Sequence, residues 1–338
     1  MTLEHQRLKE NGGAISVYQL ARGIETKNLL DQLLELHQIC FGAYPGVIPS
    51  SREFLDWYLK RPGLGRENTL LVLDGEKIVS SLFLTLGEMY WEGDLVPVGI
   101  IDTVMTHPQY RQRGLASQLI KWAEEIMQAR GCLYGYLYTL ANSGPFHLYR
   151  RLGYRPVKSV WHLQYRASSS QATPWPEVTS PEMVATFLNR CFAHHNGFVP
   201  FHHGYFRWKK IQRPDILPAK ILTIEENGIC ATLTVIRGEI TTTTGKETIF
   251  YFTDWCGQDL PSQEKILIQA LQCLPPQSKV DYLGSEGNQE WQILRKHGFQ
   301  ATLEEVAMLH PLHEEASRRL ERAGNPLWYP LIESIVGA

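Results

Sequence analysis

The sequence has few cysteines, and their spacing excludes the simplest metal and disulfide motifs. Six cysteines are spread over 338 residues, and no two of them form a Cys-x-x-Cys pair. A zinc ribbon or a disulfide framework would need paired or closely spaced cysteines. We therefore predict free, mostly buried thiols.

Long apolar runs and an excess of one charge are also missing. No run approaches the length of a membrane span, and the first six residues are polar, unlike the apolar core of a signal peptide. Lysine and arginine number 33 against 35 aspartates and glutamates, which gives a formal charge of −2. This balance creates no overall field that attracts nucleic acid or an anionic membrane. We expect a cytoplasmic protein with neither as a partner.

The chain does have enough apolar residues for two ordinary domains. Its 338 residues are 43% hydrophobic and 20% charged, a globular composition that can bury two cores. Residues 166–174 are polar, small and closed by a proline, as linkers are. The predicted division is a flexible N-terminus at 1–13, a first unit at 14–165, a linker at 166–174 and a second unit at 175–338.

A strand, a loop and a helix follow one another in residues 99–131. β-Branched and apolar residues at 99–106 predict a largely buried strand, and apolar residues at helical spacing predict a helix that begins near Leu115. The first N–H groups of a helix have no partners inside it, so together with the helix dipole they form an anion site. Arg111 and Arg113 flank this site and can bind phosphate oxygens. The pattern predicts a pyrophosphate-binding loop.

This loop and a second motif resemble those of the GNAT acyltransferase superfamily. The loop motif Arg-x-x-Gly-x-Ala at 111–116 follows a His-Pro-x-Tyr sequence at 107–110. Downstream, Asn142 precedes Tyr-x-x-x-Gly-Tyr at 149–154, which is similar to the family's Asn followed by Tyr-x-x-x-Gly-Phe/Tyr. The resemblance implies an α+β (α/β mixed) fold in which a mixed, mostly antiparallel central sheet is flanked by helices.

The resemblance also implies a coenzyme A site in the first unit. In the family, the strand before the loop splays from its neighbour and binds the pantetheine arm, and a backbone N–H near Val104 would face the thioester oxygen. Asn142 would bond the same arm or would cap the helix after it. The residues that match coenzyme-binding positions are Val104, Met105, Thr106, Arg111, Gln112, Arg113, Gly114, Leu115, Ala116, Ser117 and Asn142.

Two side chains match the family's catalytic positions. Tyr149 matches the usual general acid, since a phenol can give its proton to a departing thiolate without ionising at rest; a packing aromatic is the alternative. Asp102 lies on the same face of its strand as Val104 and is a candidate general base. A buried structural aspartate explains Asp102 equally well, and Glu88 or a water relay would then be the base.

The second half of the sequence repeats features of the first. Several identities recur at a constant shift of 151 residues and others recur once small gaps are allowed, which indicates an internal duplication. The matched pairs are Cys40-Phe41 with Cys191-Phe192, Pro49 with Pro200, Trp57 with Trp208, Gly75 with Gly228, Asp102 with Asp254, Asn142 with Asn288 and Gly153 with Gly298.

The second unit lacks the phosphate loop. Residues 257–264 contain no arginine and place Asp259 and Glu264 where an anion would bind. Leu294 stands four residues before Gly298, where the first unit has its tyrosine. We predict a tandem chain whose degenerate second unit binds no coenzyme, completes the core and walls the acceptor pocket.

The histidines at 194, 195, 202 and 203 invite a zinc interpretation, but adjacent histidines cannot easily bind one ion, so we predict no metal. The predicted function is an N-acetyltransferase in which a primary amine of a small molecule or peptide directly attacks acetyl-CoA, the co-substrate. A non-catalytic acyl-CoA sensor or scaffold is the alternative. Assembly into homo-oligomers stays open.

Overall fold

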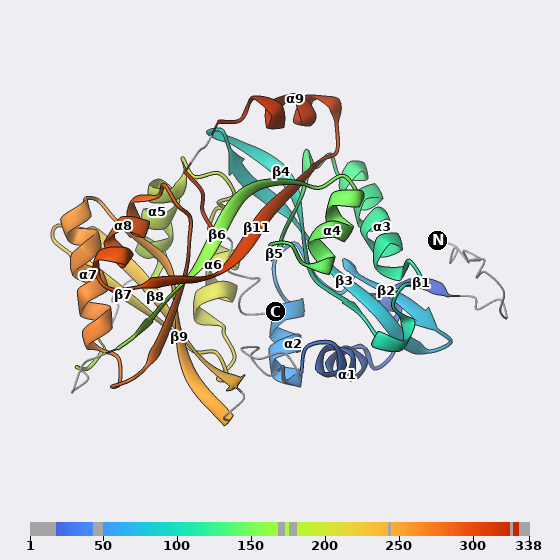
Figure 1. Cartoon of the computed structure of the whole chain (residues 1–338), viewed down its shortest axis with the longest axis horizontal. Helices are drawn as coiled ribbons and strands as arrows, with labels where there is room; N and C mark the ends of the chain where they lie inside the picture. Colours follow the sequence, from blue (N-terminus) through green and yellow to red (C-terminus); the bar gives the residue numbers. More distant parts are fainter. Residues whose placement is uncertain are drawn as a thin grey trace.

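The computed structural model describes residues 18–42, 50–167, 173–175, 181–242, 245–324 and 327–330. The predicted flexible N-terminus at 1–13 and most of the predicted linker lie outside these residues. Most elements of the N-terminal half of the chain occupy one side of the molecule and most elements of the C-terminal half the other, with the two long strands β6 and β11 crossing between them (Figure 1).

One continuous sheet of eleven strands runs through the described part of the chain, in the order β1-β2-β3-β4-β5-β11-β6-β10-β9-β8-β7. Neighbouring strands are antiparallel except for β4 with β5 and β9 with β10. The strands are β1 (Gln19–Arg22), β2 (Thr69–Asp74), β3 (Lys77–Trp91), β4 (Asp94–Thr106), β5 (Tyr134–Leu140), β6 (Arg155–Arg166), β7 (Ala219–Glu225), β8 (Ile229–Thr242), β9 (Gly245–Gly257), β10 (Lys279–Gly284) and β11 (Gln300–Pro311).

Helices flank this sheet, so the predicted mixed and mostly antiparallel fold class is confirmed. The longer helices α1, α3 and α7 bury apolar residues against the strands, as amphipathic helices do. The helices are α1 (Leu29–Phe41), α2 (Arg52–Leu59), α3 (Leu115–Ala129), α4 (Gly144–Arg151), α5 (Pro181–Phe192), α6 (His203–Phe206), α7 (Leu260–Gln272), α8 (Gln289–Lys296) and α9 (Glu314–Arg322), with short 3₁₀ or π segments η1 (Gly23–Glu25), η2 (Pro108–Tyr110) and η3 (Arg207–Ile211).

The two halves exchange their last strands. β6 belongs to the N-terminal half of the chain, yet it pairs with β10 and β11 of the C-terminal half. β11 is the last strand of the C-terminal half and inserts between β5 and β6. The two strands cross the centre of the molecule side by side (Figure 1). Each half of the sheet is therefore completed by a strand from the other repeat.

The apolar residues form one core that both halves share and one further core in each half. The shared core contains α1 and α2 residues such as Leu33 and Trp57 together with Phe198 and Trp208 of the second repeat. A second core lies under α3 and α4, and a third lies under α7 and α8. The shared core buries the surface between the repeats on the face where α1, α2, α5 and α6 lie.

A β-bulge interrupts β4 and β9 at matching places. Opposite Leu82, β4 carries the two residues at 103–104, and opposite Leu233, β9 carries the two residues at 254–255. The first residue of each bulge has a left-handed backbone, with φ of 48° at Thr103 and 50° at Asp254. Asp254 therefore corresponds to Thr103, and its alignment with Asp102 was wrong by one residue.

Candidate functional site

The predicted phosphate loop forms an open, exposed N-terminus on α3. Gly114 occupies the N-cap with φ of 79°, and no described side chain caps the helix. A Cβ atom at Gly114 would meet nothing within 4 Å in the described part of the chain, so the space over the helix end is clear. The N–H groups of Leu115, Ala116 and Ser117 point out of the first turn, where helices bind anions. The left-handed Gln112, with φ of 63°, turns the exposed loop toward this end.

Two arginines stand beside this helix end, and neighbouring groups hold them there. Arg113 donates to the Tyr18 hydroxyl at 2.5 Å, and its guanidinium lies 5.2 Å from the centroid of the Tyr110 ring. The hydroxyl of Tyr110 in turn donates to Asp74 at 2.9 Å, which raises the pKa of Tyr110. Arg111 Nε donates to the carbonyl of the last β4 residue at 3.2 Å. No motif in the sequence pointed to Tyr18 or Asp74.

β4 and β5 separate shortly after they meet. Their parallel ladder covers only 98–100 paired with 134–136. Beyond this point β4 continues to Thr106 through the bulge, so Val104 and Met105 lie on a stretch that diverges from β5. A strand edge that leaves its neighbour offers backbone N–H and C=O groups to an extended ligand. This edge ends at the predicted phosphate loop. The strand edge predicted to bind the pantetheine arm and the loop predicted to bind the pyrophosphate therefore follow one another along the chain.

Tyr149 lies on α4, close to the divergent strand. The N-cap of α4 is Ser143, whose hydroxyl accepts a hydrogen bond from the Phe146 N–H at 3.2 Å. The Tyr149 side chain is buried and packs edge-to-face on Tyr154 with centroids 5.9 Å apart. Burial raises the pKa of Tyr149 well above its usual range, and the negative charge of Asp102 adds to this. The Tyr149 hydroxyl therefore stays protonated at neutral pH.

Asn142 is exposed and has a left-handed backbone with φ of 58°. The side chain that caps α4 is that of Ser143, so the alternative interpretation of Asn142 as the cap is wrong. Asn142 follows the end of β5, so its exposed amide lies beside the gap where β4 and β5 diverge. This gap is called the strand split below.

Asp102 forms a nearly buried ion pair. Its Oδ2 accepts from Arg61 Nη1 at 2.9 Å, and the two side chains are 10% and 1% exposed. Its Oδ1 accepts from the Thr103 hydroxyl at 2.9 Å. Arg61 also donates to the Tyr58 hydroxyl at 3.2 Å. An arginine at this distance stabilises the ionised carboxylate. Arg61 follows α2 without any motif around it, so the sequence alone did not indicate it.

Glu88, the reserve candidate for the base, lies elsewhere. It is exposed and pairs with Pro97 at the far end of the β3–β4 hairpin, five residues along β3 from Phe83, the residue opposite Asp102. Five strand residues span ~17 Å. Glu88 therefore does not join the group formed by Tyr149 and Asp102.

The corresponding places in the second half are filled by the protein's own side chains. At the start of α7, Asp259 accepts from the Ser262 N–H at 2.8 Å, and this bond lowers the pKa of Asp259. Leu294 is fully buried on α8, where α4 has Tyr149. In the β9 bulge, Asp254 is buried in an ion pair with Lys210.

The histidines at 194, 195, 202 and 203 do not gather. His195 packs edge-to-face on Phe192, and burial lowers its pKa to about 4. His202 caps α6 by accepting from the Tyr205 N–H. Among the described residues, no three His, Cys, Asp or Glu side chains are placed to hold one metal ion.

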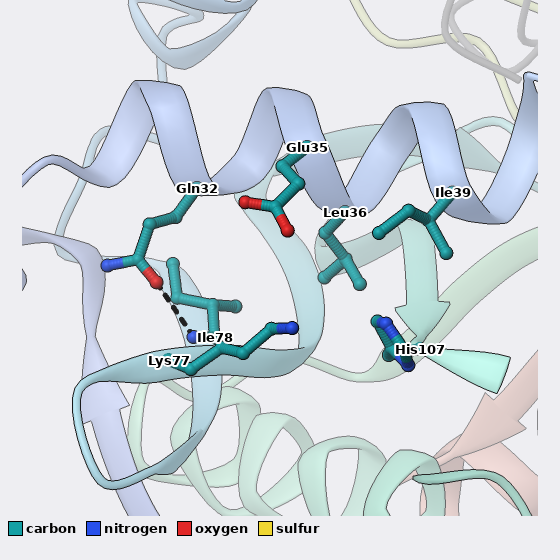
Figure 2. A pocket seen from close by; sticks show the side chains of 7 residues that line it. All are labelled: Gln32, Glu35, Leu36, Ile39, Lys77, Ile78 and His107. Atoms are coloured by element: carbon teal, nitrogen blue, oxygen red, sulfur yellow. Dashed lines mark hydrogen bonds between the residues drawn. The ribbon is translucent and has the colours of Figure 1, made fainter. Parts of the chain in front are cut away.

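Two hollows in the surface lie away from this group of residues. The one in Figure 2, between α1 and the start of β3, has a volume of about 10 Å³, and the bond from the Ile78 N–H to the Gln32 side chain crosses its edge at 2.9 Å. That volume holds about one water molecule. The other, of about 350 Å³, lies among α5, α6 and η3. Neither is lined by the phosphate loop, Tyr149 or Asp102, so the strand split defines the candidate site.

Comparison with known proteins agrees with this geometry. Residues 24–157 match the family model described as an acetyltransferase (GNAT) domain. The chain has a GNAT-superfamily fold. The matched segment contains the divergent strand, the phosphate loop and Tyr149, and it supports an acyltransferase that takes its acyl group from coenzyme A. A search of curated proteins found no match.

Solved structures extend the likeness of this GNAT fold to most of the chain. A GCN5-related N-acetyltransferase from Anabaena variabilis aligns with a TM-score of 0.65 and 18% identity, over 88% of this chain and 73% of that one. N-myristoyltransferase from Saccharomyces cerevisiae with bound myristoyl-CoA aligns with a TM-score of 0.71 and 12% identity, over 98% and 91% of the two chains. Within the described residues, no helix has both the length and the apolar character to cross a bilayer.

Proposed function

We propose that this protein is an N-acetyltransferase that moves the acetyl group of acetyl-CoA to a primary amine of a small molecule or a peptide. The observation that carries the proposal is the continuous path formed by the open edge of β4 and the uncapped, arginine-flanked N-terminus of α3. A pyrophosphate with an extended amide arm has this shape and charge. The first half contains all the parts of this path, namely the strand edge, the uncapped helix end and the two arginines.

A short acyl group is favoured by the packing where the two strands part. Four side chains around the end of the β4–β5 ladder are at most 3% exposed, namely Ile100, Met105, Tyr136 and Leu137. A long acyl chain would need an apolar cavity in this region, and opening one costs free energy because packed contacts are lost. An acetyl group asks for the least displacement of these residues.

The reaction would form one C–N bond and break one C–S bond. The amine nitrogen attacks the thioester carbon, and the backbone N–H near Val104 stabilises the oxyanion. As the C–S bond breaks, the thiolate takes the proton of the Tyr149 hydroxyl. A thiolate formed in the same buried place also has a raised proton affinity, because desolvation disfavours its charge. Solvent then returns a proton to the tyrosine.

Asp102 would orient the amine. Arg61 keeps the carboxylate ionised, so its lone pairs accept a hydrogen bond from the amine N–H and turn the nitrogen lone pair toward the thioester. The carboxylate is already engaged by the guanidinium, so in this mechanism the amine's proton leaves through water. In this mechanism Asp102 touches the substrate, whereas Arg61 acts through Asp102.

A thiol-release assay tests the proposal. The full chain is incubated with acetyl-CoA and a panel of amino acids, polyamines, aminoglycosides and peptide N-termini, and free coenzyme A is measured. Butyryl-CoA and myristoyl-CoA serve as donor controls. Acetyl transfer to at least one amine, with slower transfer from the longer donors, supports the proposal. Coenzyme binding by thermal shift without transfer to any amine would favour the sensor or scaffold.

A further inference from the structure

The two repeats meet through a pair of tryptophans at aligned positions. Trp57 of α2 and Trp208 of η3 are both buried and stack with ring centroids 4.6 Å apart and an interplanar angle of 8°. Each indole N–H donates to the backbone carbonyl of the other residue, at 3.1 and 2.8 Å. The ring stack and the two hydrogen bonds are therefore reciprocal, as they would be between two residues related by a two-fold axis.

An arginine lies over each tryptophan ring, but the two arginines have different hydrogen-bond partners. Arg213 has its guanidinium 4.8 Å from the centroid of the Trp57 ring and donates to backbone carbonyls four residues away on either side. Arg61 has its guanidinium 5.7 Å from the centroid of the Trp208 ring and donates to Asp102. Trp57 therefore contacts an arginine with backbone partners, while Trp208 contacts the arginine of the candidate site.

We infer that Trp208, supplied by the second half, is a positioning residue for the first half's active site. This inference rests on the proposed function. The guanidinium of Arg61 is a planar fork, and its side chain is 1% exposed. The guanidinium carbon lies 5.7 Å from the centroid of the Trp208 ring and 5.8 Å from that of the Tyr58 ring, while Nη1 donates to Asp102 and to the Tyr58 hydroxyl. An indole is the strongest aromatic partner for a cation. Trp208 therefore acts together with Tyr58 to fix the plane of the fork, and the fork fixes the carboxylate.

The chemical consequence is that Asp102 faces the amine in one orientation. When the ring is removed, the guanidinium gains room to rotate, and the carboxylate turns with it. Misplacing a reacting group by about 1 Å costs ~10²-fold in rate. Coenzyme binding is unaffected, because it depends on the phosphate loop and the backbone edge of β4 rather than on the Arg61 side chain. The second half therefore contributes to turnover without a coenzyme site of its own.

Three variants of the full chain separate positioning from packing. Trp208→Leu removes the ring, Trp208→Phe keeps a weaker one, and Trp57→Phe is the matched control, since it disturbs the same stack and loses the equivalent indole bond. We expect kcat to fall ~10²-fold in Trp208→Leu and less in Trp208→Phe. Trp57→Phe should keep kcat within ~2-fold, and the Kd of coenzyme A should be unchanged in all three.

A second measurement does not depend on turnover. In protein labelled with ¹⁵N-arginine, the side-chain resonance of Arg61 is assigned by its disappearance in Arg61→Lys. Its N–H protons should exchange faster with water in Trp208→Phe than in wild type, and remain protected in Trp57→Phe.

Equal losses of kcat and of exchange protection in Trp208→Phe and Trp57→Phe would reduce the pair to a packing contact and overturn the inference. Unchanged kcat in both Trp208 variants would do the same. If wild type acetylates no amine, the proposed function fails, and the exchange measurement alone decides whether Trp208 holds Arg61. If Trp208→Leu does not fold, the two phenylalanine variants decide between positioning and packing.

Discussion

The two halves of the molecule differ most at the first turn of one helix. On α3 the N-cap is Gly114 without a side-chain cap, and exposed arginines stand beside it. On α7 the N-cap is Asp259, whose carboxylate already binds the Ser262 N–H. Both helix ends attract negative charge, but the second supplies that charge from its own chain. The two helix ends thus differ both in the cap, glycine against aspartate, and in the presence of arginines beside it.

The β-bulges of β4 and β9 differ in the same way. In the β9 bulge, Lys210 and the hydroxyl of Tyr329 both contact Asp254, and the pair is fully buried. In the β4 bulge, Thr103 takes the place of Asp254, and the charged partner, Asp102, precedes it and keeps part of its surface exposed. The β9 bulge is closed by an internal ion pair, whereas the carboxylate beside the β4 bulge keeps part of its surface exposed.

The strand exchange predicts the largest effect. Residues 1–167 alone would leave β5 without β11, and β6 without either of its neighbours. Exposed strand edges with apolar faces associate with one another. We expect this fragment to aggregate, which size-exclusion chromatography and light scattering would detect. Co-expression with residues 168–338 should recover soluble complex. A monomeric, active fragment would show that each half completes its own sheet.

Tyr149→Phe tests the proposed general acid of the first half, at the position where the second half has Leu294. Because it removes one hydroxyl and keeps the ring, we expect kcat to fall ~10²–10⁴-fold while the Kd of coenzyme A barely moves. Tyr154→Phe is the control, since its buried hydroxyl has no hydrogen-bond partner among the described residues. Full activity of Tyr149→Phe on a verified acceptor would remove Tyr149 from the mechanism.

The contacts of His162 offer a test of the boundary between the halves, where β6 lies between β10 and β11. It lies on β6 with Asp281 of β10 at 3.1 Å and Glu305 of β11 at 3.4 Å. Burial would lower the pKa of His162, but the two carboxylates outweigh it and raise the pKa to about 10. The folded state therefore binds an extra proton between pH 6.5 and 10. Its stabilising effect is complete below pH 6.5 and disappears as the pH rises through 10.

His162→Gln should lower the free energy of unfolding by ~3 kcal/mol at neutral pH, because it leaves two buried carboxylates without their cation. Urea denaturation from pH 6 to pH 10 would measure this. Wild type should lose stability across the range and approach the variant, whereas the variant should lose less. A constant difference at all pH values would show that His162 is uncharged in the folded protein.

Arg113→Ala tests whether the loop before α3 binds the coenzyme, and calorimetry of wild type tests how many coenzyme sites each chain has. We expect coenzyme A binding to weaken by ~1.5–3 kcal/mol, the size of a charge-assisted contact. Titration calorimetry of wild type should give one site per chain. Arg150→Ala, which removes another exposed arginine, should bind like wild type. Two sites per chain would show that α7 binds the coenzyme despite Asp259.

The smallest effect concerns Asp259 itself. Ser51→Ala should lower the free energy of unfolding by ~1 kcal/mol through the lost cap of α2. Asp259→Ala should change it in the same direction through the lost cap of α7. No second coenzyme site should appear in calorimetry, since the region still lacks arginines. Binding of a second coenzyme would mean that the carboxylate alone blocked the site.

The sequence predicted the parts of this fold that depend on local pattern. The helix expected to begin near Leu115 does so, and the strand expected at 99–106 lies within β4. The strand exchange was missed because chain order places the last strand of a repeat beside its own β5, and nothing in the composition of β6 or β11 opposes this.

The candidate site was predictable where a motif carried it. The phosphate loop and Tyr149 stand in a recognisable order, whereas Arg61 and Trp208 are single residues whose meaning comes from contacts across 41 and more positions of sequence. The one-residue error at Asp254 has a similar origin, because a bulge changes register without leaving a sequence signal.

The exchanged strands also set the order in which the chain becomes a protein during synthesis. The edge of β5 waits for a strand that ends only at Pro311, so the first half cannot close while the ribosome is still making the second. Pairings this distant are slow to form, and an open strand edge is prone to wrong association meanwhile. A chaperone that binds unpaired strands would therefore have its main task on this protein between the emergence of β5 and that of β11.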